Sequence, residues 1–219
     1  MLASRTYFTA VTAAVLLAGT TGTALAAPAH GARRVSHLAA APSAAPGFSD
    51  GSFENPRVAP NTLRTFTTGR SIGPWKVTQA TVDLLDGHWQ AADGQQSVDL
   101  NGTEKDLPST RPGAVSQTFA TTPGATYTVT YALAGNYERG PAVKTGKVLV
   151  DGQDFQDFSF DTTGKSATNM GWVKRQMTFV ATGDSTTLTF ASTTAHTPSG
   201  PVLDDVTVHR CKPSCCCCV

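Results

Sequence analysis

The chain has 219 residues, with 17 lysines and arginines against 16 aspartates and glutamates, which gives a formal net charge of +1. These charges are spread along the sequence without a basic stripe, so the sequence predicts neither a nucleic-acid partner nor attraction to an anionic membrane. The five cysteines all lie from position 211 onward, which excludes a disulfide framework in the rest of the chain.

The first 26 residues have the three-part organisation of a secretory signal peptide. Arg5 supplies a positive charge, residues 11–19 (VTAAVLLAG) form a short apolar core, and residues 24–26 (ALA) form a small-residue cleavage site. The apolar core is much shorter than the roughly 20 residues that a membrane-spanning helix needs. We therefore expect a secreted, extracellular protein, at most associated with the cell surface, whose mature chain has no transmembrane segment.

The composition changes twice after the signal peptide. Residues 27–47 are rich in alanine and proline and poor in large apolar side chains, which is typical of a flexible linker. Residues 48–210 are rich in threonine, valine, glycine and aromatic residues, which predicts one domain with its own core. Residues 211–219 (CKPSCCCCV) form a cysteine-rich tail.

Alternation of apolar and polar residues is the repeating feature of the domain. It occurs in residues 126–135 (TYTVTYALAG), 176–181, 186–192 and 201–210, and it predicts antiparallel strands with one buried face. Turn signals separate these segments, and residues 181–186 (ATGDST) predict a hairpin, because Gly183 permits a positive φ. No stretch of ten residues has the spacing of an amphipathic helix. The domain is therefore predicted to be an all-β, two-sheet antiparallel β-sandwich, a jelly roll.

Aromatic residues on the apolar faces are expected to fill the core. Phe119, Tyr131, Phe179 and Phe190 belong to this set, and each contributes about 1.5–3 kcal/mol when fully buried. Trp75, which follows a Gly-Pro pair, and Trp172 are expected to pack in the core or at a sheet edge.

Three stretches, taken together, carry a resemblance to a known family. They are DGSFENP at residues 50–56, GPWKVTQATVDLLDGHWQAADGQQSVDLNG at residues 73–102, and GPVLDDVTV at residues 200–208. With the segment GAVSQTFATTPGATYTVTYALAGN between them, residues 48–210 resemble the choice-of-anchor C family. That family is related to the plant cell-wall proteins known as domain of unknown function 642. The resemblance implies a galactose-binding-like jelly roll, an association with cell-wall polysaccharide, and a C-terminal attachment that varies among members.

The resemblance also implies a structural calcium ion. In similar jelly rolls, acidic residues of the first and last strands share the ion, and here these are Glu54 and Asp204. Carboxylates and loop carbonyls suit calcium, which takes six to eight oxygen ligands. Asp204 shares parity with Val202 and Val208, so it is predicted to point inward, while Asp205 should face solvent. The alternative is that Asp204 accepts hydrogen bonds from backbone N–H groups without a metal.

A carbohydrate site is expected to use exposed aromatic residues, because sugars stack their C–H faces on flat rings. Trp89 (DGHWQAADGQQ) and Tyr137 (AGNYERG) lie in polar, loop-like surroundings and are the candidate stacking residues, although a structural role for Trp89 is equally open. Asn136 and Gln95 are the candidate polar partners. Asp99 is a further candidate, but its alternation with Val98 and Leu100 indicates an exposed strand position.

A catalytic constellation is not found. A glycosidase needs two carboxylates on either side of a bond, and the spacing of Asp83, Asp86, Asp99 and Glu104 singles out no pair. There is no Gly-x-Ser-x-Gly or His-Glu-x-x-His motif. The sequence therefore predicts a secreted, non-catalytic module that binds cell-wall or extracellular polysaccharide, with glycoside hydrolysis as a weaker alternative.

The tail leaves another alternative open, a surface or structural protein attached through its cysteines without a sugar ligand. The cysteines concerned are Cys211, Cys215, Cys216, Cys217 and Cys218. Adjacent Cα atoms are about 3.8 Å apart, below the roughly 4.4 Å minimum of a relaxed disulfide. Adjacent cysteines therefore pair poorly with each other, which leaves thiols for a disulfide-linked partner, a covalent anchor or a metal, unless the tail has no role.

Overall fold

The fold is described here from a computed structural model of the chain, for residues 43–103 and 111–211. Within these ranges the backbone forms strands, turns and bends and contains no helix, so the prediction of an all-β domain is confirmed. It follows that no described helix is long and apolar enough to cross a membrane.

The strands form two antiparallel sheets. Sheet 1 has the order β11-β8-β13-β6-β5-β2, with β1 paired to β13, and sheet 2 has the order β10-β9-β12-β7-β4-β3. Sheet 1 contains β1 (Ser43–Ala44), β2 (Thr62–Thr67), β5 (Thr81–Asp86), β6 (Gln96–Asp99), β8 (Thr126–Gly135), β11 (Val173–Val180) and β13 (Pro201–Arg210). Sheet 2 contains β3 (Ser71–Ile72), β4 (Trp75–Gln79), β7 (Ala114–Ala120), β9 (Val143–Val150), β10 (Gln153–Asp161) and β12 (Ser185–Ser192).

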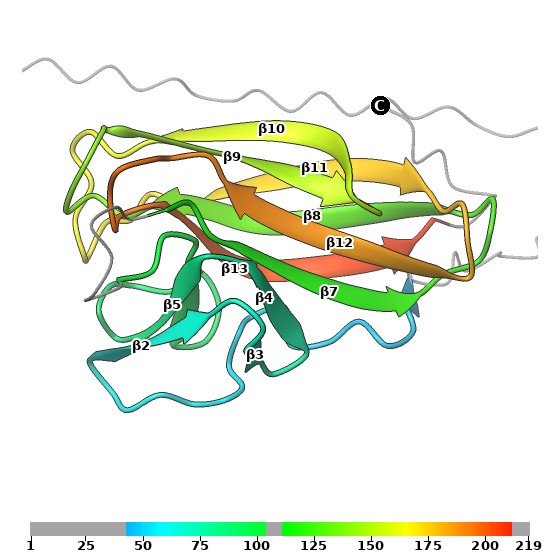
Figure 1. Ribbon diagram of the computed structural model, residues 1–219, viewed down its shortest axis with the longest axis horizontal. Coiled ribbons are helices and arrows are strands. Elements are labelled where there is room, and N and C mark those ends of the chain that lie inside the picture. Colours follow the sequence, from blue (N-terminus) through cyan, green and yellow to red (C-terminus); the bar gives the residue numbers. More distant parts are fainter. Residues whose placement is uncertain (1–42, 104–110, 212–219) are drawn as a thin grey trace, which may run out of the picture. The chain divides into compact units, whose positions relative to one another are not determined.

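The chain passes repeatedly from one sheet to the other. Strands β7, β8 and β9 belong to sheets 2, 1 and 2, and β11, β12 and β13 to sheets 1, 2 and 1. Figure 1 shows the long strands β7 to β13 running along one direction, with the shorter β2 to β5 gathered beside them. This connectivity is the predicted jelly-roll sandwich.

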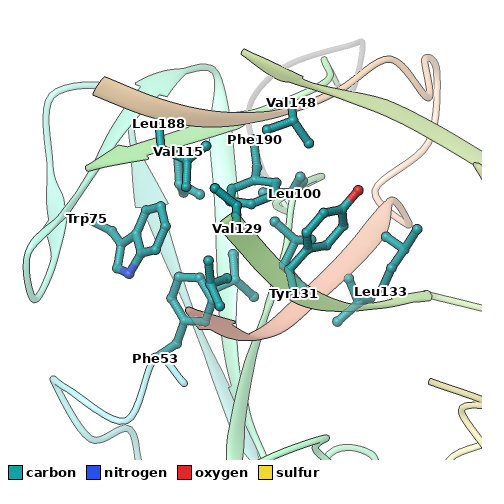
Figure 2. Packing of buried hydrophobic residues seen from close by; sticks show 14 of the residues in the cluster. Phe53, Trp75, Leu100, Val115, Val129, Tyr131, Leu133, Val148, Leu188 and Phe190 are labelled. Carbon is teal, nitrogen blue, oxygen red and sulfur yellow. The ribbon is translucent and has the colours of Figure 1, made fainter. Parts of the chain in front are cut away.

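The core between the sheets is built from the apolar faces of the alternating strands. The aromatic residues predicted to be buried, Phe119, Tyr131, Phe179 and Phe190, all belong to it. Trp75 is completely buried, and its indole Nε1 donates a hydrogen bond to the Asp50 carbonyl oxygen. Figure 2 shows the Phe53, Trp75, Phe190 and Tyr131 rings lying among Val115, Val129 and Leu188. Trp172 is half-buried against this core.

Two predictions about boundaries are wrong. Residues 181–186 do not close a hairpin, because β11 pairs with β8 in sheet 1 while β12 pairs with β7 and β9 in sheet 2. Two successive strands show the same alternating pattern whether the turn between them closes a hairpin or leads to the other sheet. The predicted linker 27–47 also extends too far, since Ser43 and Ala44 pair with β13 and Ala45 is buried.

Candidate functional site: an acidic pocket on sheet 1

Two aspartates stand side by side on the outer face of sheet 1. In the register of the sheet, Asp83 on β5 lies opposite Asp99 on β6 and opposite Thr65 on β2. Their neighbours Leu84 and Val98 are also opposite each other and belong to the core. Because successive residues of a strand point to opposite faces, Asp83 and Asp99 face away from sheet 2.

These aspartates lie in a pocket with a volume of about 140 Å³. Leu63, Leu85 and Pro198 supply apolar surface. Polar and charged groups come from loops that are distant in the sequence, and the lining comprises Leu63, Asp83, Leu85, His88, Asp99, Thr103, Asn136, Glu138, Arg139, Pro198 and Ser199. The pocket thus has two fixed carboxyl groups beside apolar surface and a polar rim.

Hydrogen bonds fix both carboxyl groups in place. Asp83 accepts from the Thr65 hydroxyl at 2.6 Å and from the Thr103 amide at 2.9 Å. The Asp99 Oδ1 accepts from the Asn101 and Gly200 amides at 2.8 and 3.0 Å, and its Oδ2 accepts from the Asn136 side-chain amide at 2.8 Å.

Gly200 approaches this network very closely. A Cβ atom at this position would lie 2.4 Å from the Asn101 side-chain oxygen. Any larger residue would therefore displace the chain that donates to Asp99.

Burial changes the protonation of this region. Desolvation raises the pKa of Asp99 to about 8, against the opposing hydrogen bonds from Asn136 and Asn101, and the nearby Asp83 raises it further. Desolvation also raises the pKa of Asp83. Asp99 therefore holds a proton more tightly than an ordinary aspartate does.

A buried lysine supports the loop at the rim of the pocket. Lys144 on β9 is fully buried and donates from Nζ to the carbonyl oxygen of Arg139. Desolvation lowers the pKa of Lys144, and the charge of Asp99 acts in the opposite direction. At the same rim, the His88 Nε2 lies 2.9 Å from the Glu138 Oε1, so the 136–140 loop is connected both to the core and to the loop after β5.

The proposed stacking role of Trp89 is contradicted by its burial. Its side chain is only 4% exposed, it belongs to the core cluster, and its Nε1 donates to the Ser97 hydroxyl at 2.8 Å. Neither face of the indole is available to a sugar. Trp89 instead attaches the loop after β5 to the outer face of sheet 1.

The other candidate residues separate into two groups. Asn136 lines the pocket, where it binds Asp99. Tyr137, the next residue, is half-buried against the core, and its stacking role stays a prediction. Gln95 is exposed, is not among the residues that line the pocket, and donates from its side chain to the Gly94 carbonyl oxygen.

The prediction that Asp99 occupies an exposed strand position is wrong. The alternating pattern indicates an exposed strand position, but Asp99 is only 1% exposed. The pattern does place it on the outer face correctly. Loops from elsewhere in the chain then cover that face, and nothing local to Asp99 signals this cover. The same holds for Asp83, which the sequence could not pair with Asp99 because the pairing depends on the sheet register.

Asp204 is buried, as predicted, but on the opposite face. A bulge after Asp204 breaks the alternation of β13, so that Asp204 lies opposite Ala132, Thr207 opposite Thr130 and Val208 opposite Val129. Asp204 therefore shares the outer face of sheet 1 with Thr207. Asp205, in the bulge, is partly exposed and binds the Lys174 ammonium group at 2.7 Å.

Glu54 and Asp204 hold the same loop, which includes residues 92–96. Asp204 Oδ2 accepts from the Ala92 and Asp93 amides at 2.7 and 2.9 Å. Glu54 Oε1 accepts from the amides of Gln95 and Gln96, both at 2.7 Å. Desolvation raises the pKa of Asp204 to about 7, although the backbone donors oppose the shift.

This donor arrangement corresponds to the metal-free alternative for Asp204. N–H groups direct positive hydrogens at Glu54 Oε1 and at both carboxylate oxygens of Asp204. Among residues 43–103 and 111–211, no group of three or more histidine, cysteine, aspartate or glutamate side chains could hold a metal ion. The structural calcium ion shared by Glu54 and Asp204 stays a prediction.

Only the first cysteine of the tail falls within the described residues. The Cys211 amide donates to the Thr126 carbonyl oxygen at 2.8 Å, and its thiol lies 3.1 Å from the Thr128 hydroxyl. Cys215, Cys216, Cys217 and Cys218 lie outside the described residues, so the anchor or disulfide role of the tail stays a prediction.

Comparison with known proteins gives a family match and several more distant likenesses. The model of the family described as "Protein of unknown function (DUF642)" matches residues 47–209. Halomucin of Haloquadratum walsbyi is 29% identical over 165 residues, which cover 73% of this chain and 2% of halomucin. The chain thus spans about one fiftieth of the length of that relative.

Two solved structures illustrate the likeness in fold. A family 35 carbohydrate-binding module from Clostridium thermocellum has a TM-score of 0.43 and 11% identity, over 67% of this chain and 97% of the module. The CBM22-1 xylan-binding domain of Xyn10C from Paenibacillus barcinonensis has a TM-score of 0.45 and 16% identity, over 72% of this chain and 99% of that domain.

Proposed function

The chain belongs to the DUF642 family, and we propose that it is a non-catalytic module that binds extracellular polysaccharide in the acidic pocket of sheet 1. The relationship to the choice-of-anchor C branch is part of this proposal. The observation that carries the proposal is the Asp83–Asp99 pair, held beside apolar surface and under a polar rim.

The chemistry of the pocket suits a sugar ring. Sugar hydroxyl groups both donate and accept hydrogen bonds, and the pocket offers carboxyl oxygens, the Asn136 amide and the His88–Glu138 pair. The C–H face of the ring would lie against Leu63, Leu85 or Pro198. Sites for drug-sized ligands usually exceed roughly 300 Å³, so a volume of about 140 Å³ favours a single ring or a chain end.

Binding is favoured over hydrolysis by the hydrogen bonds of the two aspartates. Every carboxyl oxygen of Asp83 and Asp99 already accepts from a protein donor. A general acid or a nucleophile must exchange partners during the reaction, whereas a binding surface gains precision from groups that are held in place. Release of reducing sugar from a retained polysaccharide would contradict this assignment.

The experiment is a glycan array combined with retention on insoluble polysaccharides, with and without calcium. Two variants change the rim, Glu138→Gln and Asn136→Ala, and Asp184→Asn is the control because Asp184 is exposed and outside the pocket lining. We expect the rim variants to weaken binding by about tenfold, the value of one lost hydrogen bond to a charged or well-placed polar group, while Asp184→Asn binds normally. Unchanged binding by both rim variants, or no retained polysaccharide, would refute the proposal.

Secretion and attachment through the C-terminal cysteines complete the proposal. They are supported by the composition of residues 1–26 and 211–219. Cleavage after residue 26 would be detected by N-terminal sequencing of the exported protein. Non-reducing gels of the chain with and without residues 211–219 test the attachment, and identical monomer bands would exclude a disulfide-linked partner.

A further inference from the structure

A second pocket lies at the edge of the sandwich, along strand β2 and the turn that follows it. It has a volume of about 420 Å³ and is lined by Arg64, Thr65, Phe66, Thr67, Arg70 and Ser71. Strand β2 is the last strand of sheet 1 and β3 is the last strand of sheet 2. The segment that crosses from one sheet to the other therefore supplies the whole lining.

The two arginines give this pocket a positive charge. The Arg64 guanidinium carbon lies 4.8 Å from the centre of the buried Phe66 ring, a cation–π contact that holds the guanidinium plane in position. Arg70 follows the turn at residues 67–70, where its amide donates to the Thr67 carbonyl oxygen.

Neither arginine is neutralised by the part of the chain that the structure describes. The ion pairs within 4.0 Å there involve Arg57, His88, Lys147 and Lys174 but neither Arg64 nor Arg70. Both side chains are exposed. Their guanidinium N–H groups are thus available to an external acceptor.

The alternation of β2 places Arg64 and Phe66 of this pocket on the face of the strand opposite to that of the acidic pocket. Leu63 lines the acidic pocket and Thr65 donates to Asp83, whereas Arg64 and Phe66 lie opposite Leu84 and Val82, on the face that turns toward sheet 2. Neighbouring residues of a strand are about 3.3 Å apart. One polymer that bends around the edge of β2 can therefore contact both pockets.

From this geometry we propose that the Arg64–Arg70 pocket binds an oxyanion of an acidic polysaccharide, either a carboxylate or a sulfate ester. The planar fork of a guanidinium group matches the oxygens of such an anion in a two-point hydrogen bond. The Thr67 and Ser71 side chains are exposed beside the arginines and offer hydroxyl groups to the rest of the sugar. The assignment of the anion to a saccharide rests on the function proposed for the acidic pocket.

The experiment compares charged and uncharged forms of the same polymers on the full chain. Polygalacturonate is paired with its methyl ester, and dextran sulfate with dextran, so that the two pairs distinguish a carboxylate from a sulfate. The test variant is the double substitution Arg64→Gln/Arg70→Gln. Its control is Arg175→Gln/Arg210→Gln, which removes the same charge from two exposed arginines outside this pocket.

We expect at least one charged polymer to bind about tenfold more tightly than its uncharged form. The test variant should lose this preference, and the control variant should keep it within about twofold. Arg64→Lys should lose most of it as well, since an ammonium group retains the charge but not the fork.

Three results would overturn the inference. They are equal binding of charged and uncharged polymers, retention of the preference by the Arg64→Gln/Arg70→Gln variant, and equally tight binding of a single-stranded DNA oligomer, which would remove the assignment to a saccharide. The first two leave the function of the acidic pocket intact, because that function is tested with Glu138→Gln on uncharged glycans. Conversely, the chain could bind no uncharged glycan and still prefer a charged polymer through Arg64 and Arg70. That result would refute the function of the acidic pocket and leave the anion site intact.

Discussion

The outer face of sheet 1 has two halves, which differ in whether their polar side chains are exposed or buried. In the open half, formed by β8, β11 and the end of β13, Thr130 and Thr207 are partly exposed and Thr178 is exposed. In the covered half, formed by β2, β5, β6 and the start of β13, Asp83, Asp99 and Asp204 are buried under loops.

The difference shows in which half the stability of the fold depends on hydrogen bonds within the protein. A polar group in the open half can exchange its partner for water, so its loss costs little. A group in the covered half must be satisfied by the protein itself, and its loss leaves buried donors without acceptors. The covered half is also the half that contains the acidic pocket.

The largest expected effect is at Asp204. Asp204→Ala leaves the Ala92, Asp93 and Asp205 amides without their acceptor, and we expect the free energy of unfolding to fall by about 3 kcal/mol. Urea denaturation of the two proteins measures this loss. The free energy of unfolding of Asp204→Asn, which keeps one acceptor oxygen, should lie between those of the wild type and Asp204→Ala. An Asp204→Ala protein as stable as the wild type would show that the two halves do not differ.

The second prediction concerns pH. Asp99 and Asp204 have pKa values raised to about 8 and about 7 in the folded chain, mainly by burial. Between the ordinary value of 3.8 and these values, the folded chain retains protons that the unfolded chain releases. Stability must therefore fall as pH rises through this interval.

We expect the free energy of unfolding to fall progressively between pH 5 and pH 8. Denaturation curves at pH 5, 6, 7 and 8 measure it. Asp99→Asn removes one of the two titrating groups while keeping the shape of the side chain, and it should reduce the slope of the profile to the part that Asp204 contributes. Stability that increases from pH 5 to pH 8 would contradict the burial of these carboxyl groups.

A smaller effect is expected at the contact that holds the covering loop. Ser97→Ala removes the acceptor of the buried Trp89 Nε1, which should lower the free energy of unfolding by about 1–2 kcal/mol. Because this loop also carries His88, weaker glycan binding should accompany the loss. Thermal unfolding and glycan retention on the same samples measure both quantities, and a fully stable variant would indicate that water replaces the hydroxyl.

The smallest effect is expected in the open half. The Thr130 and Thr207 hydroxyl groups are 2.6 Å apart, but both side chains are partly exposed. Thr130→Ala should therefore cost about 0.5 kcal/mol. A double-mutant cycle with Thr207→Ala gives their coupling, and a coupling as large as the Asp204→Ala loss would show that the two halves do not differ.

How much the sequence predicts depends on whether the deciding contacts are local. The alternation in residues 126–135, 186–192 and 201–210 predicts strands, the buried Tyr131 and Phe190, and the sandwich itself. The prediction that Trp89 is exposed rests on its polar neighbours in the sequence, and it is wrong. The ring is buried by core residues and by Ser97, which lie outside this local segment. The alternation fails at residues 181–186, since a local pattern cannot tell which sheet the next strand will join.

By itself, then, the sequence determined the fold class, because strand periodicity and turn residues act over a few positions. It also determined which side chains alternate with the core, except at the bulge after Asp204. Only the tertiary structure decided which outer-face residues are covered, that Asp83 stands beside Asp99, and that Leu63 and Arg64 line different pockets. These features arise from sheet register and from loops contributed by distant segments, and their free energy depends on partners that no local pattern specifies.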